Sequence, residues 1–322
     1  MRIVIPGGSG QLGHILARHL YAAGHEVTVI SRNPKSAPWT TLRWDGLTLD
    51  PAWTSTLEGA DAVIHLSGRS VNCRYTPANR REIVDSRVVP TRLVGKAIEA
   101  CAQPPRVWMN ASTSTFYRDS RNIPGDGPQD EFTGEKGGQE PNVPDSWNFS
   151  ISVAEQWEEA FYASTTPATR KIALRTSMTM SPDNGGIFSI LLRLVRFGLG
   201  GQQGGGDQYV SWMHELDYCR AIDFLLAREE ISGAVNFTAP NPLLNRDFMR
   251  GLRQAWGIPF GLPAPGPILA VGTFLMRTES ELVLKSRRAV PTVLLRHGFR
   301  FDYPTWDEAA RELVGRYRTA KA

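Results

Sequence analysis

Seven residues near the start of the chain limit most sharply what it can fold into. The string Gly7-Gly8-Ser9-Gly10-Gln11-Leu12-Gly13 directly follows the apolar run Arg2–Ile5 and opens a stretch with helical spacing, Gln11–Ala23. In a strand-loop-helix unit, Gly7 would allow a tight turn, Gly10 would let backbone amides approach a pyrophosphate, and Gly13 would let the helix pack closely on the strand. The helix start would add unpaired N–H groups and the positive end of the helix dipole. This context predicts a dinucleotide-binding loop.

Apolar runs alternate with helical patterns from the first residue to about residue 175. After the glycine loop, further helices are predicted at Arg80–Cys101 and from near Ser152, where Val153, Trp157 and Phe161 recur every four residues. Strands that alternate with helices predict an α/β fold of Rossmann type, a doubly wound parallel sheet covered on both faces. The other predicted strands are Glu26–Ile30, Ala62–Leu66, Arg106–Asn110 and Lys171–Leu174.

The rest of the chain predicts loops and a second lobe. Phe116–Trp147 is rich in Gly, Pro, Asp and Asn, which predicts a long surface excursion over the site, and Gly198–Gly206 has the composition of a mobile loop. After Asn241 the pattern changes to helices and Pro-rich turns. We therefore predict a dinucleotide-binding domain at 1–177, to which 210–238 returns, and a smaller, mostly helical substrate lobe at 178–209 and 239–322.

Composition narrows the classes of partner. A net charge of +4 and a pI near 9.0 come from scattered Lys and Arg residues, so we expect no nucleic-acid partner. Three cysteines without metal-ligand spacing predict a reducing compartment and no metal site. The apolar stretch Ile268–Met276 is too short to span a bilayer, and no targeting signature is present, which predicts a cytoplasmic protein without a membrane partner.

Several motifs resemble one protein family. The spacing Gly-x-x-Gly-x-x-Gly is the form used by the extended short-chain dehydrogenase/reductases, and Asp61-Ala-Val-Ile-His65-Leu-Ser67-Gly68 resembles their Asp-x-Val-x-His-x-Ala strand. Finer segments are similar to the branch of epimerase-like proteins sometimes named after a cell-division inhibitor, with its characteristic C-terminal domain. These segments are Arg74-Tyr75-Thr76 with Arg80, Ser86-Arg87 and Thr91; Val210–His214 with Asp217; Val235–Pro242; and Gly298–Phe301 with Tyr303-Pro304.

The resemblance implies an NADP(H)-binding protein of epimerase or reductase type that acts on a small molecule. The family usually has Gly-Glu-Asn where this chain has Gly68-Arg69-Ser70, which removes an acid near the expected nicotinamide end. The predicted cofactor-binding residues are Gly7, Ser9, Gly10, Gln11, Leu12, Gly13, Ser31, Arg32, Leu66, Ser67, Gly68, Arg87, Ala111, Arg175 and Ser177.

The end of the second predicted strand indicates which cofactor is bound. A domain that selects NAD places Asp or Glu there, roughly 20 residues past the loop, to accept hydrogen bonds from the ribose 2′-hydroxyl. This chain reads Val29-Ile30-Ser31-Arg32-Asn33, without a carboxylate. Because a guanidinium suits phosphate geometry, Arg32 predicts a preference for the 2′-phosphate of NADP(H); the alternative is an arginine that merely solvates a strand end.

The chemistry is harder to predict, because the Tyr-x-x-x-Lys pair that transfers protons in most of this superfamily is missing. The expected helix reads Asn148–Glu155 without Tyr or Lys, and Tyr317 with Lys321 lies too close to the C-terminus to serve. Ser112 lies at the end of the strand predicted at Arg106–Asn110, where the superfamily has its substrate-orienting Ser or Thr, and it could donate a stabilising hydrogen bond. Tyr117 could supply a proton if the loop folds inward, or pack under the loop.

Other candidate residues have both structural and functional interpretations. His65 is predicted to be structural, and His214 to order a loop with Asp217 rather than to titrate in catalysis. Arg80 and Arg87 would share a helix face, where they would either meet cofactor phosphates or an acidic substrate, or remain solvated. Two functions stay open: an NADP(H)-dependent enzyme acting on an unknown small molecule, and a cofactor-binding regulatory or partner-binding protein with little catalysis.

Overall fold

The computed structural model describes residues 1–121, 125–266, 279 and 281–321. Its centre is a seven-stranded sheet in which every neighbouring pair is parallel, with the order β10-β6-β5-β4-β1-β2-β3. The chain winds outward from β1 in one direction and then from β4 in the other, so the topological switch point lies between β1 and β4. The strands are β1 (Arg2–Pro6), β2 (Glu26–Ser31), β3 (Thr40–Arg43), β4 (Ala62–His65), β5 (Val107–Thr113), β6 (Arg170–Thr176) and β10 (Gly233–Phe237).

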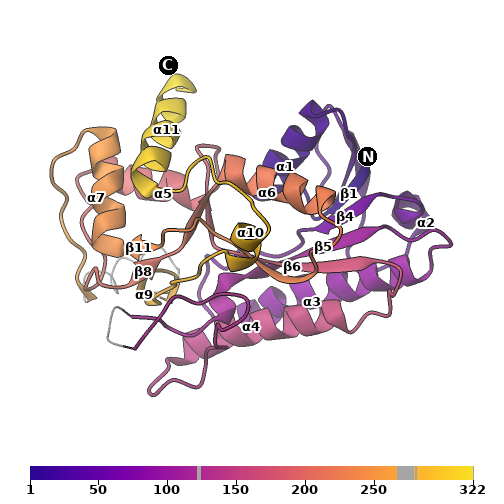
Figure 1. Cartoon of the computed structure of the whole chain (residues 1–322), viewed down its shortest axis with the longest axis horizontal. Helices are drawn as coiled ribbons and strands as arrows, with labels where there is room; N and C mark the ends of the chain where they lie inside the picture. Colours follow the sequence, from indigo (N-terminus) through magenta and orange to yellow (C-terminus); the bar gives the residue numbers. More distant parts are fainter. Residues whose placement is uncertain (122–124, 267–278, 280, 322) are drawn as a thin grey trace.

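Helices cover both faces of this sheet (Figure 1). On one face, α1 (Gln11–Ala22) and α6 (Glu215–Ala227) pack on a core that includes Ile3 and Ile5 of β1. On the other, α3 (Pro77–Glu99) and α4 (Asp145–Tyr162) pack on a core that includes Val4. Successive residues of a strand point to opposite faces, so apolar runs such as β1 supply both cores. The predicted Rossmann-type fold is confirmed.

A second group of elements forms the smaller lobe, at the left of Figure 1. Its apolar core joins the helices around Trp306, whose ring stacks on Phe248 at a centroid distance of 4.1 Å and meets Trp212 edge-on at 5.0 Å. The elements are β7 (Met178–Met180), α5 (Ile187–Arg196), β8 (Tyr209–Val210), β9 (Trp212–His214), β11 (Leu243–Leu244), α7 (Asn245–Trp256) and α11 (Trp306–Thr319).

Part of the segment predicted as the substrate lobe packs on the large sheet. Val293 and Leu294 of α10 (Thr292–Arg296), together with Phe299, belong to the core on the α1 side of the large sheet. The chain therefore returns to the sheet a second time, after the return at α6 and β10, before it ends in α11 of the smaller lobe. The short elements that complete the fold are α2 (Pro51–Thr54), η1 (Ser55–Leu57), η2 (Ser114–Phe116) and α9 (Glu281–Leu284).

Helices α3 and α4 and strand β3 differ clearly from the sequence prediction, and the predicted strands shift by up to three residues at their ends. Helix α3 begins at Pro77, because the Thr76 side chain accepts a hydrogen bond from the Asn79 backbone N–H at 3.3 Å and proline suits the first helical turn. Helix α4 begins at Asp145, well before Ser152, so the excursion is shorter than predicted. Strand β3 was not predicted, since four half-exposed residues carry little apolar pattern.

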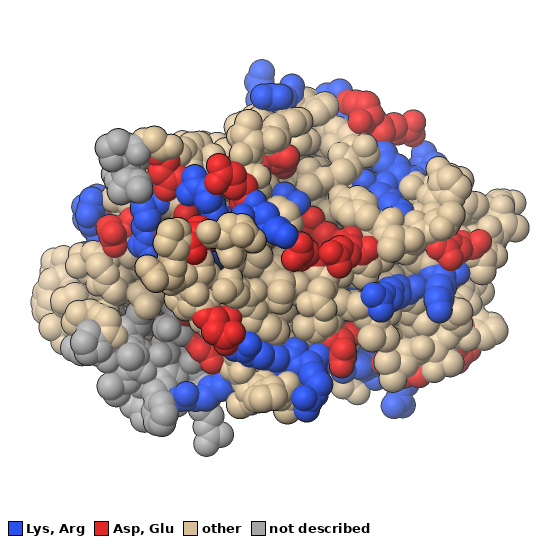
Figure 2. Space-filling model, turned by 90° about the horizontal axis from the view of Figure 1, so that it is seen from below, with Lys and Arg blue, Asp and Glu red and all other residues tan. Residues whose placement is uncertain are grey.

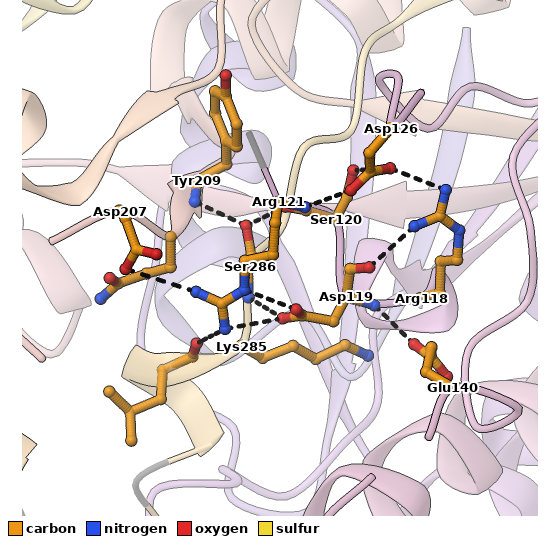
Figure 3. Close-up of polar contacts among 12 residues, drawn as sticks. Arg118, Asp119, Ser120, Arg121, Asp126, Glu140, Asp207, Tyr209, Lys285 and Ser286 are labelled. Atoms are coloured by element: carbon orange, nitrogen blue, oxygen red, sulfur yellow. Dashed lines mark hydrogen bonds and ion pairs between the residues drawn. The ribbon is translucent and has the colours of Figure 1, made fainter. Parts of the chain in front are cut away.

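The excursion before α4 is fastened to the segment that follows α9 (Figure 3). Asp119 accepts a hydrogen bond from the Ser286 backbone N–H at 2.7 Å and pairs with Arg121 at 2.7 Å. Ser286 in turn donates its hydroxyl hydrogen to the Ser120 carbonyl and accepts one from the Tyr209 N–H at 2.8 Å. These contacts hold Asp119 and Ser120, in the first part of the excursion, against the segment after α9.

Figure 2 shows the face seen from below, where Lys and Arg side chains are interspersed with Asp and Glu. Among the described residues, no helix is both long and apolar enough to cross a bilayer. The apolar stretch Ile268–Met276 lies outside the described residues.

Candidate functional site

The glycine loop has the geometry expected of its three glycines. Gly7 has φ +78°, and a Cβ there would lie 2.5 Å from the Ser67 backbone nitrogen, so only glycine fits. A Cβ on Gly13 would lie 2.4 Å from the Gly8 Cα, which confirms the close approach of α1 to the loop. A Cβ on Gly10 would meet no atom within 4 Å. Gly10 caps the N-terminus of α1 and therefore faces open space.

Two cavities meet at this loop, at the switch point of the sheet. The smaller has a volume of about 350 Å³ and the larger about 720 Å³. Gly7, Gly10, Leu66 and Gly68 line both of them. A cleft outside the carboxyl ends of parallel strands at the switch point is where open α/β sheets bind their ligands. The two cavities together have the placement of an extended ligand site.

The larger cavity lies beside the ends of β2 and β3. Ser31 donates a hydrogen bond to Ser9 Oγ at 2.7 Å, which ties the strand end to the glycine loop. Arg32 follows Ser31, is exposed and has no hydrogen-bond or ion-pair partner in the described part of the chain. Arg43, which pairs in register with Ser31 across β2 and β3, is also exposed and lines an adjoining hollow with Arg32. Sequence reasoning missed Arg43, because it missed β3.

Asp45, Glu82 and Asp85 line the larger cavity, and Asp45 also lines the hollow that holds Arg32 and Arg43. Asp45 accepts hydrogen bonds from the Leu47 N–H at 2.7 Å, the Thr48 N–H at 2.8 Å and the Thr48 hydroxyl at 2.7 Å. The Thr48 hydroxyl and these backbone groups lower the pKa of Asp45 to about 2. The hydrogen bonds of the Asp45 carboxylate thus stay within its own turn.

The smaller cavity is lined mainly by apolar side chains from α3, α4 and the β-strand ends. Its polar lining includes Ser112, Ser150, Glu281 and Arg87. The predicted residues Gln11, Leu12, Gly13, Ala111 and Ser177 also line this cavity, whereas Ser9, Ser31, Arg32 and Ser67 line the larger one.

Arg80 and Arg87, the two arginines predicted to share a face of α3, bind different partners. Arg87 donates to the Ile83 carbonyl at 2.8 Å and to the Arg69 carbonyl at 2.9 Å, and its guanidinium lies 5.1 Å from the Trp157 ring centroid. Burial lowers the pKa of Arg87 to about 10. Arg80 instead pairs with Asp145 at the start of α4. Only Arg87 lines the cavity, with its donors directed to backbone carbonyls.

Ser112 ends in the cavity, as predicted, but its hydroxyl hydrogen points away from it. Its Oγ donates to Oε1 of Glu158 at 2.6 Å, and both side chains are buried. Glu158 is also bound by Arg175, whose Nε and Nη2 donate to its two oxygens at 2.8 Å each. Ser112 was predicted to donate a hydrogen bond to the substrate. In the structure its hydroxyl hydrogen is instead donated to the Glu158 carboxylate.

Tyr117 and Arg175 line neither cavity. The Tyr117 side chain is 3% exposed; its hydroxyl donates to Asn236 Oδ1 at 2.9 Å and accepts from Arg175 at 3.0 Å. The Arg175 guanidinium lies 3.8 Å from the Phe116 ring centroid. Tyr117 is thus packed within the fold, which is the alternative to a role as proton donor. Arg175 was predicted to bind the cofactor, but it holds Glu158 and does not line the cleft.

Both histidines singled out in the sequence are buried within the fold. His65 Nδ1 lies 2.7 Å from Asn110 Oδ1, and burial lowers the pKa of His65 to about 4. His214 caps α6 by accepting from the Leu216 N–H at 3.1 Å, and its Nε2 lies 2.8 Å from Glu312. Asp217 accepts hydrogen bonds from the backbone N–H groups of the 302–303 segment at 2.9 Å. These groups order the chain return, as predicted.

Tyr75 and Glu281 are titratable residues of the smaller cavity that were not among the predicted site residues. Tyr75 is buried, and its hydroxyl lies 3.3 Å from Ser150 Oγ; burial and the charge of Glu281 raise the pKa of Tyr75 to about 12. Glu281 is 1% exposed, pairs with Arg287 and accepts from Ser150 at 3.2 Å. Nearby, Lys285 donates to the backbone carbonyl of Thr115, another lining residue, at 2.8 Å. Burial lowers the pKa of Lys285 to about 7.

No group of three or more His, Cys, Asp or Glu side chains within the described ranges is arranged to hold a metal ion.

Known proteins resemble the whole chain. The epimerase family protein SDR39U1 of Bos taurus is 29% identical over 98% of this chain and 100% of its own length, and YfhF of Bacillus subtilis is 28% identical over 99% and 100%. The crystal structure of human SDR39U1 with NADPH superposes with a TM-score of 0.83 at 26% identity, covering 98% of this chain and 99% of that one. A nucleoside-diphosphate sugar epimerase from Corynebacterium glutamicum gives a TM-score of 0.73 at 27% identity over 97% of this chain and 58% of its own.

Two family models match different parts of the sequence. The model of the NAD dependent epimerase/dehydratase family matches residues 3–237, and a domain of unknown function, DUF1731, matches residues 264–313. The first match spans the whole parallel sheet from β1 to β10 and contains both cavities' loop and strand-end residues. The chain belongs to the NAD dependent epimerase/dehydratase family, with a DUF1731 domain in its C-terminal part.

Proposed function

We propose that this protein binds NADP(H) across the two cavities and uses it to oxidise or reduce a small molecule. The pyrophosphate would lie at the N-terminus of α1, where Gly10 leaves open space and the first helical N–H groups lack intrahelical partners. The adenosine half would occupy the larger cavity and the nicotinamide half the smaller. The observation that carries this proposal is the unobstructed Gly10 at the point where the two cavities meet.

A preference for NADP(H) over NAD(H) is supported by the charges around the end of β2. Arg32 and Arg43 place two exposed guanidinium groups beside the strand ends, and a 2′-phosphate would pair with them. Of the carboxylates that line the same cavity, Asp45 already accepts three hydrogen bonds within its own turn, and Glu82 pairs with Arg69. The relative solved with NADPH agrees with this assignment.

The reaction would use hydride exchange with the nicotinamide ring, the chemistry that this cofactor supplies when it is bound. The chain itself would exclude water with apolar residues of α4 and orient the substrate with hydroxyl groups at the end of β5. Phe149 and Val153 of α4 line the cavity where a Tyr-x-x-x-Lys pair would otherwise supply a proton. General acid-base catalysis of that kind is worth about 10²–10⁴-fold, so we expect slow turnover of sugar nucleotides.

The alternative is a cofactor-binding regulatory protein with little catalysis, which the apolar Phe149 and Val153 favour. A turnover screen separates the two functions. NADPH consumption is followed with sugar nucleotides, quinones, enones and ketones, and NADP⁺ reduction with alcohols. Turnover of a small non-nucleotide substrate by the wild-type chain, lowered by Ser112→Ala, supports the enzyme. NADPH binding without turnover in either direction supports the regulatory alternative.

Tyr117→Phe is the matched control for this screen. Tyr117 lies outside both cavities, so its loss should reduce stability through Asn236 and Arg175 rather than remove the chemistry. If Tyr117→Phe abolishes turnover in a folded protein while Ser112→Ala stays active, the proposed roles are wrong. Brisk epimerisation of a sugar nucleotide would also contradict them.

A further inference from the structure

Ser112 is the last side chain of a hydrogen-bond chain that has a fixed direction. Asn236 donates its amide hydrogen to the Val290 carbonyl at 2.9 Å, so its Oδ1 is the acceptor for Tyr117. The Tyr117 hydroxyl, having donated to Asn236, can only accept from Arg175. Arg175 has no acceptor and therefore donates to Tyr117 and to both oxygens of Glu158.

This direction fixes what Ser112 offers to the cavity. An ionised carboxylate accepts and does not donate, so at 2.6 Å the shared hydrogen belongs to Ser112 and points at Glu158. A hydroxyl carries one hydrogen and two lone pairs, so a lone pair is what remains for a molecule in the cavity. Turning the hydrogen toward the cavity would break a charge-assisted bond to a buried carboxylate, which is costly.

The opposite wall also presents a hydrogen-bond acceptor. Glu281 is 1% exposed, with its charge balanced by Arg287, and the Ser150 hydroxyl donates to it at 3.2 Å. Arg87, the cation among the described lining residues, already donates to two carbonyls. The apolar side chains of the lining include Val71, Ile83 and Trp157, and further hydroxyl groups come from Thr113, Thr115, Thr176 and Ser177. Because Ser112 and Glu281 both present acceptors, this side of the cavity favours a ligand that donates a hydrogen bond, and an anion, which only accepts, fits these two groups poorly.

We propose that the smaller cavity selects a neutral, mainly apolar molecule that carries a hydroxyl or N–H group, and that Glu158 sets this preference by holding the hydrogen of Ser112. The inference rests on the proposed function, because the nicotinamide half of the cofactor would occupy part of the same cavity. Glu158 is a positioning residue that acts through Ser112. A ketone meets a lone pair of Ser112, whereas the corresponding alcohol donates to it.

The test compares two probes that differ only at this group, 1-phenylethanol and acetophenone, with UDP-glucose as the charged alternative. Binding to the full chain saturated with NADP⁺ is measured by saturation-transfer NMR and competition. One buried hydrogen bond that is made or left unmade corresponds to a preference on the order of tenfold, so the alcohol should bind about tenfold tighter than the ketone. UDP-glucose should not compete with either probe.

Three variants locate the preference. Ser112→Ala should bring the affinity ratio of alcohol to ketone close to one, because no lone pair is then held toward the probe. Glu158→Gln should lower the ratio, because a neutral amide holds the Ser112 hydrogen less strongly. Thr115→Val removes another hydroxyl of the same cavity and should keep the ratio. If Glu158→Gln does not fold, Ser112→Ala against Thr115→Val still decides the test.

The failure of this inference differs from failure of the proposed function. A wild-type ratio of one or below, tighter binding of UDP-glucose, or no binding of either probe at millimolar concentration overturns the inference while NADPH binding stands. A protein that does not bind NADPH overturns the proposed function itself. An unchanged ratio in folded Ser112→Ala would show that the preference arises elsewhere.

Discussion

Replacing Gly10 with valine tests the proposed cofactor site at its most specific point. The backbone at Gly10 has φ −73° and ψ 172°, an extended conformation that valine adopts readily, and a Cβ there meets no atom within 4 Å. The folded chain should therefore accept the new side chain. The isopropyl group would instead occupy the space at the helix N-terminus that the pyrophosphate needs.

The structure gives both the expected magnitude and a matched control. Valine is a poorer N-cap than glycine, so Gly10→Val should cost about 1 kcal/mol of stability or less. NADPH affinity should fall on the order of 100-fold or more, because several phosphate contacts of about 1.5–3 kcal/mol each are blocked. At Gly13, where a Cβ would lie 2.4 Å from the Gly8 Cα, the same change should destabilise the fold by roughly 1–3 kcal/mol or more.

Two measurements on the two variants decide the matter. Trp44 lines the larger cavity and Trp157 the smaller, so quenching of tryptophan fluorescence reports NADPH binding. Thermal unfolding followed by circular dichroism reports stability. Gly10→Val should melt close to the wild type and show no quenching, while Gly13→Val should melt at a lower temperature. A folded Gly10→Val protein that keeps its NADPH affinity would refute the role given to the loop.

Three further predictions follow from individual side chains. Arg32→Glu should reverse the cofactor preference, because a charge-assisted contact of about 1.5–3 kcal/mol is replaced by repulsion, and parallel titrations with NADPH and NADH would detect this. Ser112→Ala should lower any turnover found in the screen more than Tyr117→Phe does, as compared by initial rates. Burial holds the pKa of His65 near 4 against an ordinary 6.5, so the unfolded chain takes up this proton first as the pH falls. His65 should therefore account for a loss of about 3 kcal/mol of stability between pH 6.5 and 4, measured by urea unfolding as the difference between the wild type and a His65→Asn variant, which should lose less over the same range.

Much of the fold could be predicted from local pattern, and so could the loop. Strand, turn and helix signals are strongest between residues that are close in sequence. This holds for the strand before Gly7, the helix after Gly10, and the end of the second strand, where Arg32 stands and no carboxylate is present. Arg43 escaped prediction because β3 is a four-residue, half-exposed strand whose place depends on pairing with β2. The early start of α4 escaped because its first turn has no apolar period.

The hydrogen-bond direction at Ser112 could not be predicted from the sequence. Glu158 lies next to Trp157 in a helix that the sequence marks only as a packing stripe, and its contact with Ser112 arises when α4 packs on the sheet. Glu281 reaches the cavity from the far end of the chain, because the excursion and the segment after α9 are fastened together (Figure 3). Such contacts depend on tertiary packing, for which neither spacing nor composition gives a signal.

The central claim, that this cleft is built for NADP(H), is tested most directly by titrating NADPH and NADH separately into the wild-type chain and comparing the dissociation constants. Two guanidinium groups beside the 2′ position predict that NADPH binds on the order of tenfold to 100-fold tighter than NADH. Equal affinity for the two cofactors, or tighter binding of NADH, would contradict the assignment.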